Sequence, residues 1–152
     1  MGGAECPVAR ALDAVGDWWS LLIVRDAFDG VRRFNDFQRS LGVARGILTT
    51  RLRELVERGV FDVVPAAKGR PFPEYALTPL GRDLLPVIVA LRQWGENHFY
   101  RAGEQHSRLI AKATRKTVDR LVVRAGGKPV AMEDVEVLRV SGRGTTGVRQ
   151  KR

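Results

Sequence analysis

The clearest pattern of apolar and polar positions in this chain of 152 residues lies between Val43 and Gly59. Four apolar residues repeat there at the spacing of one inward-facing helix stripe: Leu48, Leu52, Leu55 and Val56. The opposite side carries hydroxyl and guanidinium groups: Arg45, Thr49, Thr50 and Arg53. The pattern predicts a helix that starts near Ala44 and stops at Gly59, with a polar face suited to base edges and phosphates in a DNA major groove. An ordinary amphipathic core helix is the alternative for this segment alone.

Short strand-like segments follow that helix. Residues 61–65 and 74–77 have the composition of strands, and Lys68-Gly69-Arg70 between them predicts a basic turn. A helix, a strand, a basic turn and a second strand, in that order, are typical of a winged helix.

Three helical patterns precede this segment. The first opens at Cys6-Pro7 and ends at Gly16, and Asp17 is a suitable N-cap for a second helix through about residue 28. A third helix over residues 33–41 ends at a tight corner formed by Gly42-Val43. Two short helices that meet at such a corner predict a helix-turn-helix.

A long helix is predicted from Thr78-Pro79 to about Tyr100, with a bend at Pro86. Its apolar stripe follows a 4-3-4-3-4 spacing: Leu80, Leu84, Val87, Leu91, Trp94 and His98. A stripe of this kind favours a partner helix, and therefore a dimer. Packing against the chain's own domain is the alternative.

The remainder of the chain is basic. Residues 106–124 predict a helix or a helix followed by a strand, and residues 135–140 predict the second strand of a small hairpin. Residues 141–152 contain little to bury, so we expect them to be disordered. The predicted fold is α+β and mostly α, with a winged-helix domain over 1–103, a small extension over 104–140 and a basic tail over 141–152.

Composition and charge narrow the possible functions. The chain has no apolar run long enough to span a membrane, no export signal and a single cysteine, so we expect a cytoplasmic protein. Of the net charge of +9, residues 30–58 contribute +4 and residues 106–152 contribute +8, whereas residues 1–29 carry −3. The predicted DNA-facing helices are thus positive while the first helices are acidic, a polarity typical of a protein that binds nucleic acid.

The sequence contains no recognisable catalytic or metal-binding pattern. His98 and His106 have no acid or cysteine partners at ligand spacing, and the GGKP stretch lacks the rest of a phosphate loop. We therefore expect neither an enzyme nor a bound metal or cofactor.

Four stretches of the chain, in order, resemble the HxlR-type winged-helix transcriptional regulators of bacteria, relatives of the larger MarR-like group. They are CPVARALDAVGDWW, RRFNDFQRSL, LTTRLRELVERGVF and YALTPLGRDLLPVIVALRQWGENH, within residues 6–99. The resemblance implies a homodimer on an inverted-repeat operator in double-stranded DNA. The first and last long helices would form the interface, through Val8, Leu12, Leu84, Val87, Leu91 and Trp94.

The resemblance also assigns roles to single residues. Arg45, Thr49, Thr50 and Arg53 would face the major groove, Arg51 would contact phosphate or buttress the helix, and Arg33 would contact phosphate. Lys68 and Arg70 would lie on the wing. Gly46 and Trp18 replace polar or basic residues that are usual in the family, and the C-terminal extension lacks the paired cysteines that would bind zinc.

Two features suggest regulation. Cys6 lies at a helix N-terminus, where the helix dipole favours the reactive thiolate, and some relatives sense oxidants or electrophiles at the matching position. A merely inherited small residue is the alternative. Trp18 and Trp94 are candidates for a small-ligand pocket between subunits or, alternatively, for core residues.

The sequence therefore predicts a sequence-specific transcriptional repressor, modulated at Cys6 or by a small ligand. The alternative is a winged-helix module that binds a protein partner, with a basic tail that binds nucleic acid nonspecifically.

Overall fold

The computed structural model describes residues 6–66, 69 and 71–138. The chain forms two compact units, one that ends at Leu121 and one that begins at Val122. The fold is α+β and mostly α, as the sequence predicts. Among the described residues, no helix is long and apolar enough to cross a membrane.

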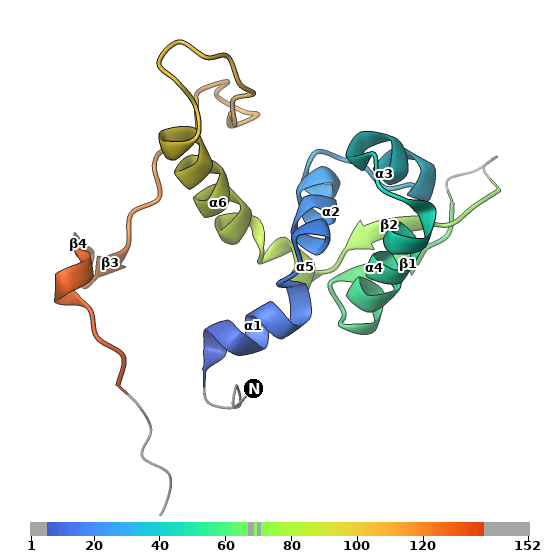
Figure 1. Cartoon of the computed structure of the whole chain (residues 1–152), viewed down its shortest axis with the longest axis horizontal. Helices are drawn as coiled ribbons and strands as arrows, with labels where there is room; N and C mark the ends of the chain where they lie inside the picture. The colour runs from blue at the N-terminus through green and yellow to red at the C-terminus, as the bar shows by residue number, and fades with distance from the viewer. Residues whose placement is uncertain (1–5, 67–68, 70, 139–152) are drawn as a thin grey trace, which may run out of the picture. The chain divides into compact units, whose positions relative to one another are not determined.

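Four helices open the first unit, close to their predicted bounds: α1 (Pro7–Val15), α2 (Trp18–Phe28), α3 (Phe34–Leu41) and α4 (Arg45–Glu57) (Figure 1). Asp17 caps α2 as predicted, because its carboxylate accepts a hydrogen bond from the Ser20 backbone N–H at 3.0 Å. Gly42 follows α3 in the left-handed conformation, at φ +61°, and makes the corner between α3 and α4.

The end of α4 is determined by Gly59, which has a φ of +74°. The Gly59 N–H donates to the Val56 carbonyl and the Val60 N–H to the Leu55 carbonyl, both at 2.9 Å. This pair of bonds is the Schellman arrangement, which satisfies carbonyls that the helix leaves free. The chain then enters the wing directly.

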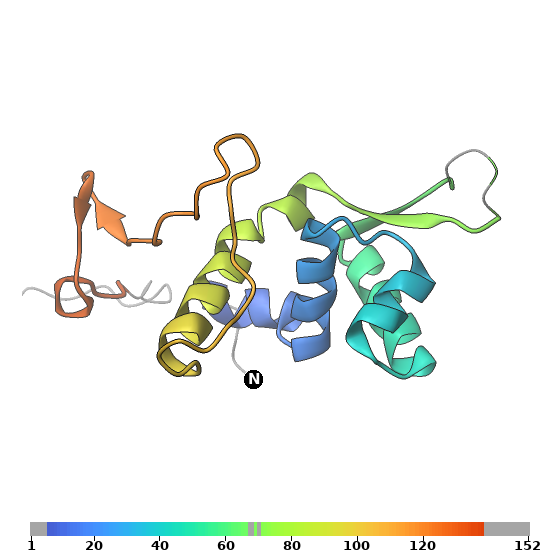
Figure 2. The ribbon, with the colours of Figure 1, turned by 90° about the horizontal axis from the view of Figure 1, so that it is seen from above.

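The wing is an antiparallel hairpin of β1 (Phe61–Val64) and β2 (Glu74–Leu77), with Phe61 opposite Leu77 and Val64 opposite Glu74. Figure 2 shows the two strands projecting away from the helices. The Thr78 hydroxyl donates to the Gly59 carbonyl at 2.6 Å, so the start of one strand and the end of the other are tied together.

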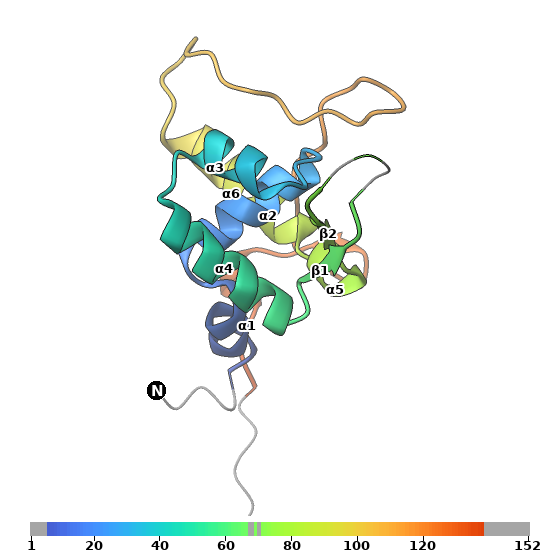
Figure 3. The ribbon, with the colours of Figure 1, turned by 90° about the vertical axis from the view of Figure 1, so that its right-hand side faces the viewer.

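The hydrophobic core joins α2, α3, α4 and the wing. Its fully buried members include Ile23, Val24, Phe37, Leu48, Leu52, Leu55 and Phe61. The three leucines of α4 predicted to face inward are therefore confirmed, and the Phe37 ring meets Phe61 edge to face, with centroids 6.4 Å apart. Figure 3 shows α4 crossing the front of this assembly, with α3 above it and the wing beside it.

The predicted continuous helix over residues 78–100 is wrong in one respect. It is two helices, α5 (Pro79–Arg82) and α6 (Leu85–His98), rather than one bent helix. Pro86 falls in the first turn of α6, where its missing N–H costs nothing, whereas in a continuous helix it would remove a bond to the turn before it. The break therefore lies just before the proline.

The predicted helix within residues 106–124 is also wrong. These residues form irregular chain with one isolated bridge between Ile110 and Thr117. Residues 104–121, here called the strap, are held by side chains of α6. The Gln93 side-chain amide accepts a hydrogen bond from the Leu121 N–H at 2.8 Å and donates one to the Asp119 carbonyl at 2.9 Å. These side-chain bonds satisfy backbone groups that a helix or a sheet would otherwise satisfy.

The second unit contains β3 (Arg124–Ala125), β4 (Lys128–Pro129) and a short 3-10 helix, η1 (Met132–Asp134). Gly126 and Gly127 form the turn between these two strands, and both have positive φ. The hairpin pairs β3 with β4, so the predicted second strand at 135–140 is wrong over its described part, 135–138. The tail at 141–152 lies outside the described residues.

Candidate nucleic-acid interface

The exposed face of α4 opposes its buried leucines, as the periodicity predicts. Arg45, Thr49 and Arg53 are exposed and Thr50 is half-buried. A guanidinium can bond a guanine edge or a phosphate, and a threonine can offer a hydroxyl or a methyl group to a base. The face thus carries the functional groups that major-groove recognition uses, on a helix held rigidly by the core.

Contacts with neighbouring side chains position two of these residues. The Arg45 guanidinium lies over the Phe34 ring, 5.1 Å from its centroid, so the first turn of α4 is steadied by α3. The Thr49 hydroxyl donates to the Arg45 carbonyl at 2.9 Å and therefore turns its oxygen lone pairs and its methyl group toward other partners.

Arg51 and Arg53 differ sharply although they are two residues apart. The Arg51 side chain is 34% exposed and donates to the Glu54 carboxylate at 2.6 Å, while its Nε lies 3.3 Å from Asp17 Oδ1. The Arg53 side chain is 65% exposed, and its Nε lies 3.8 Å from Glu57 Oε1. Arg51 is thus engaged as a buttress between α4 and the start of α2, whereas Arg53 is available to an external anion.

A groove of about 640 Å³ lies between the start of α3, the start of α4 and the wing. Arg33 and Arg45 line it, together with three residues that sequence reasoning missed: Asn35, Arg39 and Phe72. Arg39 pairs with Asp36 at 3.2 Å. The basic composition of residues 30–58 points to such a groove, but the folding of the wing against α3 brings Phe72 to it. The predicted wing contacts Lys68 and Arg70 lie outside the described residues.

The base of the wing is fixed to the chain that precedes α3. The Tyr75 N–H donates to the Arg32 carbonyl at 2.8 Å, and Arg32 Nε lies 3.1 Å from the Glu74 carboxylate. Glu74 is buried, so this ion pair is held in a fixed geometry. The wing and the helix-turn-helix therefore form one surface.

The residues predicted to form a dimer interface are mostly exposed. Val8, Leu12, Val87, Leu91 and Trp94 are each between 45% and 66% exposed, on α1 and α6. Leu84 differs, because it is half-buried against the core of its own domain. An exposed stripe of this size on two helices is an apolar surface without cover in the single chain.

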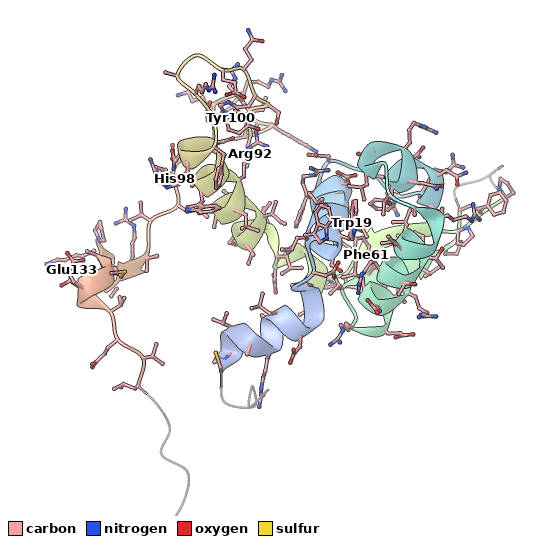
Figure 4. All side chains as sticks on the ribbon, viewed as in Figure 1. Trp19, Phe61, Arg92, His98, Tyr100 and Glu133 are labelled. Carbon is pink, nitrogen blue, oxygen red and sulfur yellow. The ribbon has the colours of Figure 1, made fainter. Side chains whose placement is uncertain are left out.

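The three residues proposed for regulation belong to elements other than α4. Cys6 is exposed at the N-cap of α1. The Trp18 ring contacts the Trp19 ring at a tilt of 34°, with centroids 4.2 Å apart. Trp94 meets the Phe99 ring edge on at 5.0 Å and lies 5.7 Å from His98, which Figure 4 labels near the end of α6. The structure does not bring Trp18 and Trp94 together in any of the described cavities.

Comparison with known proteins agrees with this architecture. A family model described as HxlR-like helix-turn-helix matches residues 14–103. An uncharacterized HTH-type transcriptional regulator of Mycobacterium tuberculosis is 52% identical over 94 residues, which are 62% of this chain and 60% of the relative. The match thus spans about three-fifths of that relative. YybR of Bacillus subtilis, also named an uncharacterized HTH-type transcriptional regulator, is 37% identical over 99 residues, 61% of this chain and 75% of YybR.

Two solved structures extend the comparison. PA1607, a proposed transcription factor, is 55% identical with a TM-score of 0.84, over 90% of this chain and 96% of PA1607. The redox regulator HypR in its reduced form is 34% identical with a TM-score of 0.56, over 61% of this chain and 93% of HypR. Together with the helix-turn-helix, the wing and the family match over residues 14–103, these likenesses show that the chain belongs to the HxlR-like helix-turn-helix family of transcriptional regulators.

Proposed function

We propose that this chain is a sequence-specific DNA-binding repressor that acts as a homodimer. The observation that carries the proposal is the division of α4 into a fully buried leucine stripe and a polar face, on which Arg45, Thr49 and Arg53 are exposed and Thr50 is half-buried. The buried stripe fixes the helix, and the exposed face offers donors to base edges. Arg33 and, on the wing, Lys68 and Arg70 would add phosphate contacts that set the register on the duplex.

The apolar surface on α1 and α6 supports the dimer. We propose that Val8, Leu12, Val87, Leu91 and Trp94 meet the same residues of a second copy, because a two-fold interface is self-complementary. Two copies of α4 would then enter successive major grooves of an inverted repeat. A glutamate at Val87 would place two like charges in this interface, so V87E should be monomeric by light scattering and should bind the operator far more weakly.

The proposal is tested by selection of bound fragments from genomic or random duplex DNA, followed by affinity measurements on the selected site. Arg45→Ala should weaken binding to that site by about 5- to 150-fold, the range expected for the loss of one good base contact. Arg101→Ala is a matched control, because Arg101 is an exposed arginine beyond the end of α6. The logarithm of affinity should also fall steeply with the logarithm of salt concentration.

Equal binding of selected and random duplex would reject the proposal. So would an Arg45→Ala variant that discriminates as well as the unaltered protein. Capture of a protein partner without any DNA discrimination would instead favour the interaction module.

We further propose that an oxidant or electrophile at Cys6, or a ligand at the subunit interface beside Trp18 and Trp94, changes the spacing of the two α4 helices. The exposure of Cys6 and the similarity to the redox regulator HypR support the first route. With a single cysteine, the chain can form an intersubunit disulfide, a mixed disulfide or an adduct.

A further inference from the structure

A cavity of about 530 Å³ lies between α2 and α6 and is bounded at one end by the strap. Its apolar lining comes from Leu21 and Leu22 of α2 and from Ile88 and Leu91 of α6. Its volume falls within the range of small-molecule sites, which combine an apolar lining with a few fixed polar groups. The cavity is separate from the groove beside α4.

The wall formed by α6 and the strap is held by its own contacts. Arg92 Nε lies 2.7 Å from Glu96 Oε1 in an ion pair that does not have hydrogen-bond geometry, so this buried N–H has no hydrogen-bond acceptor among the described residues. The Arg92 guanidinium also donates to the Ser107 carbonyl and, at 3.0 Å, to its hydroxyl. The Tyr100 and His106 rings contact each other at a tilt of 43°, with centroids 4.6 Å apart. Figure 4 labels Arg92 and Tyr100 close together at the C-terminal end of α6. This wall is therefore preformed.

The opposite wall contains an incompletely satisfied carboxylate. Asp26 is only 3% exposed, and its Oδ1 accepts both bonds from Arg25, from Nε at 2.9 Å and from Nη2 at 2.6 Å. Its Oδ2 is buried and accepts no hydrogen bond from any described residue. A buried acceptor without a donor costs free energy, so this atom favours a donor from outside the chain. Arg25, whose side chain is 43% exposed, can swing aside to admit one.

The charge of the lining indicates the class of that donor. Two lining arginines, Arg25 and Arg92, face three carboxylates, Asp26, Asp29 and Glu96. Each arginine pairs with one of these carboxylates, Arg25 with Asp26 and Arg92 with Glu96, whereas Asp29 pairs with neither lining arginine. His106 Nε2 lies 3.8 Å from Glu96 Oε1. We propose that the cavity is an effector site for small organic cations, namely amidines or amines that carry an aryl or alkyl group. The cationic end would donate to Asp26 Oδ2, and the hydrocarbon would pack on the leucine and isoleucine lining.

The regulatory consequence rests on the proposed function. The cavity lies between α6, which carries the proposed dimer surface and packs on the core through Ile88, and α2, which packs in the core with α3 and α4. A ligand that wedges between α2 and α6 would change the angle between the DNA-reading body and the dimer, and hence the spacing of the two α4 helices. Its effect on DNA affinity equals the effect of DNA on its own affinity.

Benzamidine is a suitable probe, because its cationic amidinium group can donate an N–H to Asp26 Oδ2 and its ring matches the apolar lining. Calorimetric titration of the full chain should detect benzamidine, whereas benzoate, the same ring with a negative charge, should bind at least tenfold more weakly. Asp26→Asn should weaken benzamidine binding at least tenfold. Asp62→Asn is the control, since Asp62 is an exposed carboxylate of β1, outside the cavity lining.

A second variant keeps the test valid if Asp26→Asn fails to fold. Gly95 lines the cavity, and a Cβ built there meets nothing within 4 Å, so Gly95→Leu should fill the space in a folded protein and abolish benzamidine binding. The proposal is wrong if benzamidine binds no more tightly than benzoate, or if either variant binds benzamidine with unchanged affinity. It is also wrong if neither compound binds because the partner subunit fills the cavity. DNA discrimination by the unliganded protein is measured separately, so failure of this site and failure of the proposed function are distinguishable.

Discussion

Arg51 and Arg53 offer a direct test of how α4 divides structural and recognition roles. Each is replaced by methionine, which keeps an unbranched apolar stem and the helix propensity of arginine but lacks the charged guanidinium. We expect Arg51→Met to lower stability and Arg53→Met to lower DNA affinity. The two effects should separate because only Arg51 is engaged by Asp17 and Glu54.

The magnitudes follow from the exposure of the two side chains. Arg53 has a single long contact with Glu57, and exposed helix pairs of this kind contribute about 0.3–0.5 kcal/mol, so its loss should barely change the free energy of unfolding. Arg51 has one short charged hydrogen bond and a second ion pair, both partly exposed to water. We expect its loss to cost about 1–2 kcal/mol, between the values for exposed pairs and for charged hydrogen bonds.

DNA affinity should respond in the opposite order. Loss of a base contact by Arg53 costs about 1–3 kcal/mol, which is roughly a 5- to 150-fold weaker operator complex. Urea unfolding gives the first quantity, and fluorescence anisotropy on the selected operator gives the second, under conditions in which both variants are folded. An Arg53→Met protein with unchanged affinity, or an Arg51→Met protein of full stability that no longer binds DNA, would refute this division of roles.

Three further results are expected. Phe37→Ala should lower the free energy of unfolding by about 3–5 kcal/mol in a denaturant titration, because the ring is fully buried against Phe61 and Tyr75. A loss below about 1 kcal/mol would contradict the placement of Phe37 in the hydrophobic core. Gly46→Ala should raise the same quantity by about 0.5–1 kcal/mol, since a Cβ there meets nothing within 4 Å, and a lower melting temperature would contradict this. Cys6→Ser should abolish operator release by diamide or quinones in a binding assay; unchanged release would end the sensing hypothesis.

The sequence predicts the helix-turn-helix and wing well because local signals and core burial agree there. Asp17 caps α2, Gly59 ends α4, and the leucine stripe of α4 is the stripe that the core buries. The break before α6 was missed because apolar spacing continues across it. Periodicity shows which residues share a face, but it does not show whether a proline falls inside one helix or begins the next.

The strap shows the limit of pattern reasoning more clearly. Its backbone is held by the side chain of Gln93, 26 and 28 residues earlier in the chain, and its start by Arg92. No local periodicity encodes such contacts. Likewise, the groove residue Phe72 and the cavity residue Asp26 acquire their surroundings only when distant elements pack, so their spacing in the sequence gave no sign of either site.

One carboxylate links the recognition helix to the rest of the molecule. Asp17 accepts a bond from the Ser20 N–H at the start of α2 and also lies 3.3 Å from Arg51 of α4, so the position of α4 depends on where α2 begins. The same α2 lines the cavity opposite α6. A change in the packing of α2 on α6 therefore reaches α4 through an ion pair as well as through the shared core. Arg51 would then matter less for binding DNA than for transmitting the effect of a bound effector to the DNA-binding helix. An Arg51→Met protein should therefore bind benzamidine as tightly as the unaltered protein does. Benzamidine should, however, change the operator affinity of this variant less than it changes that of the unaltered protein.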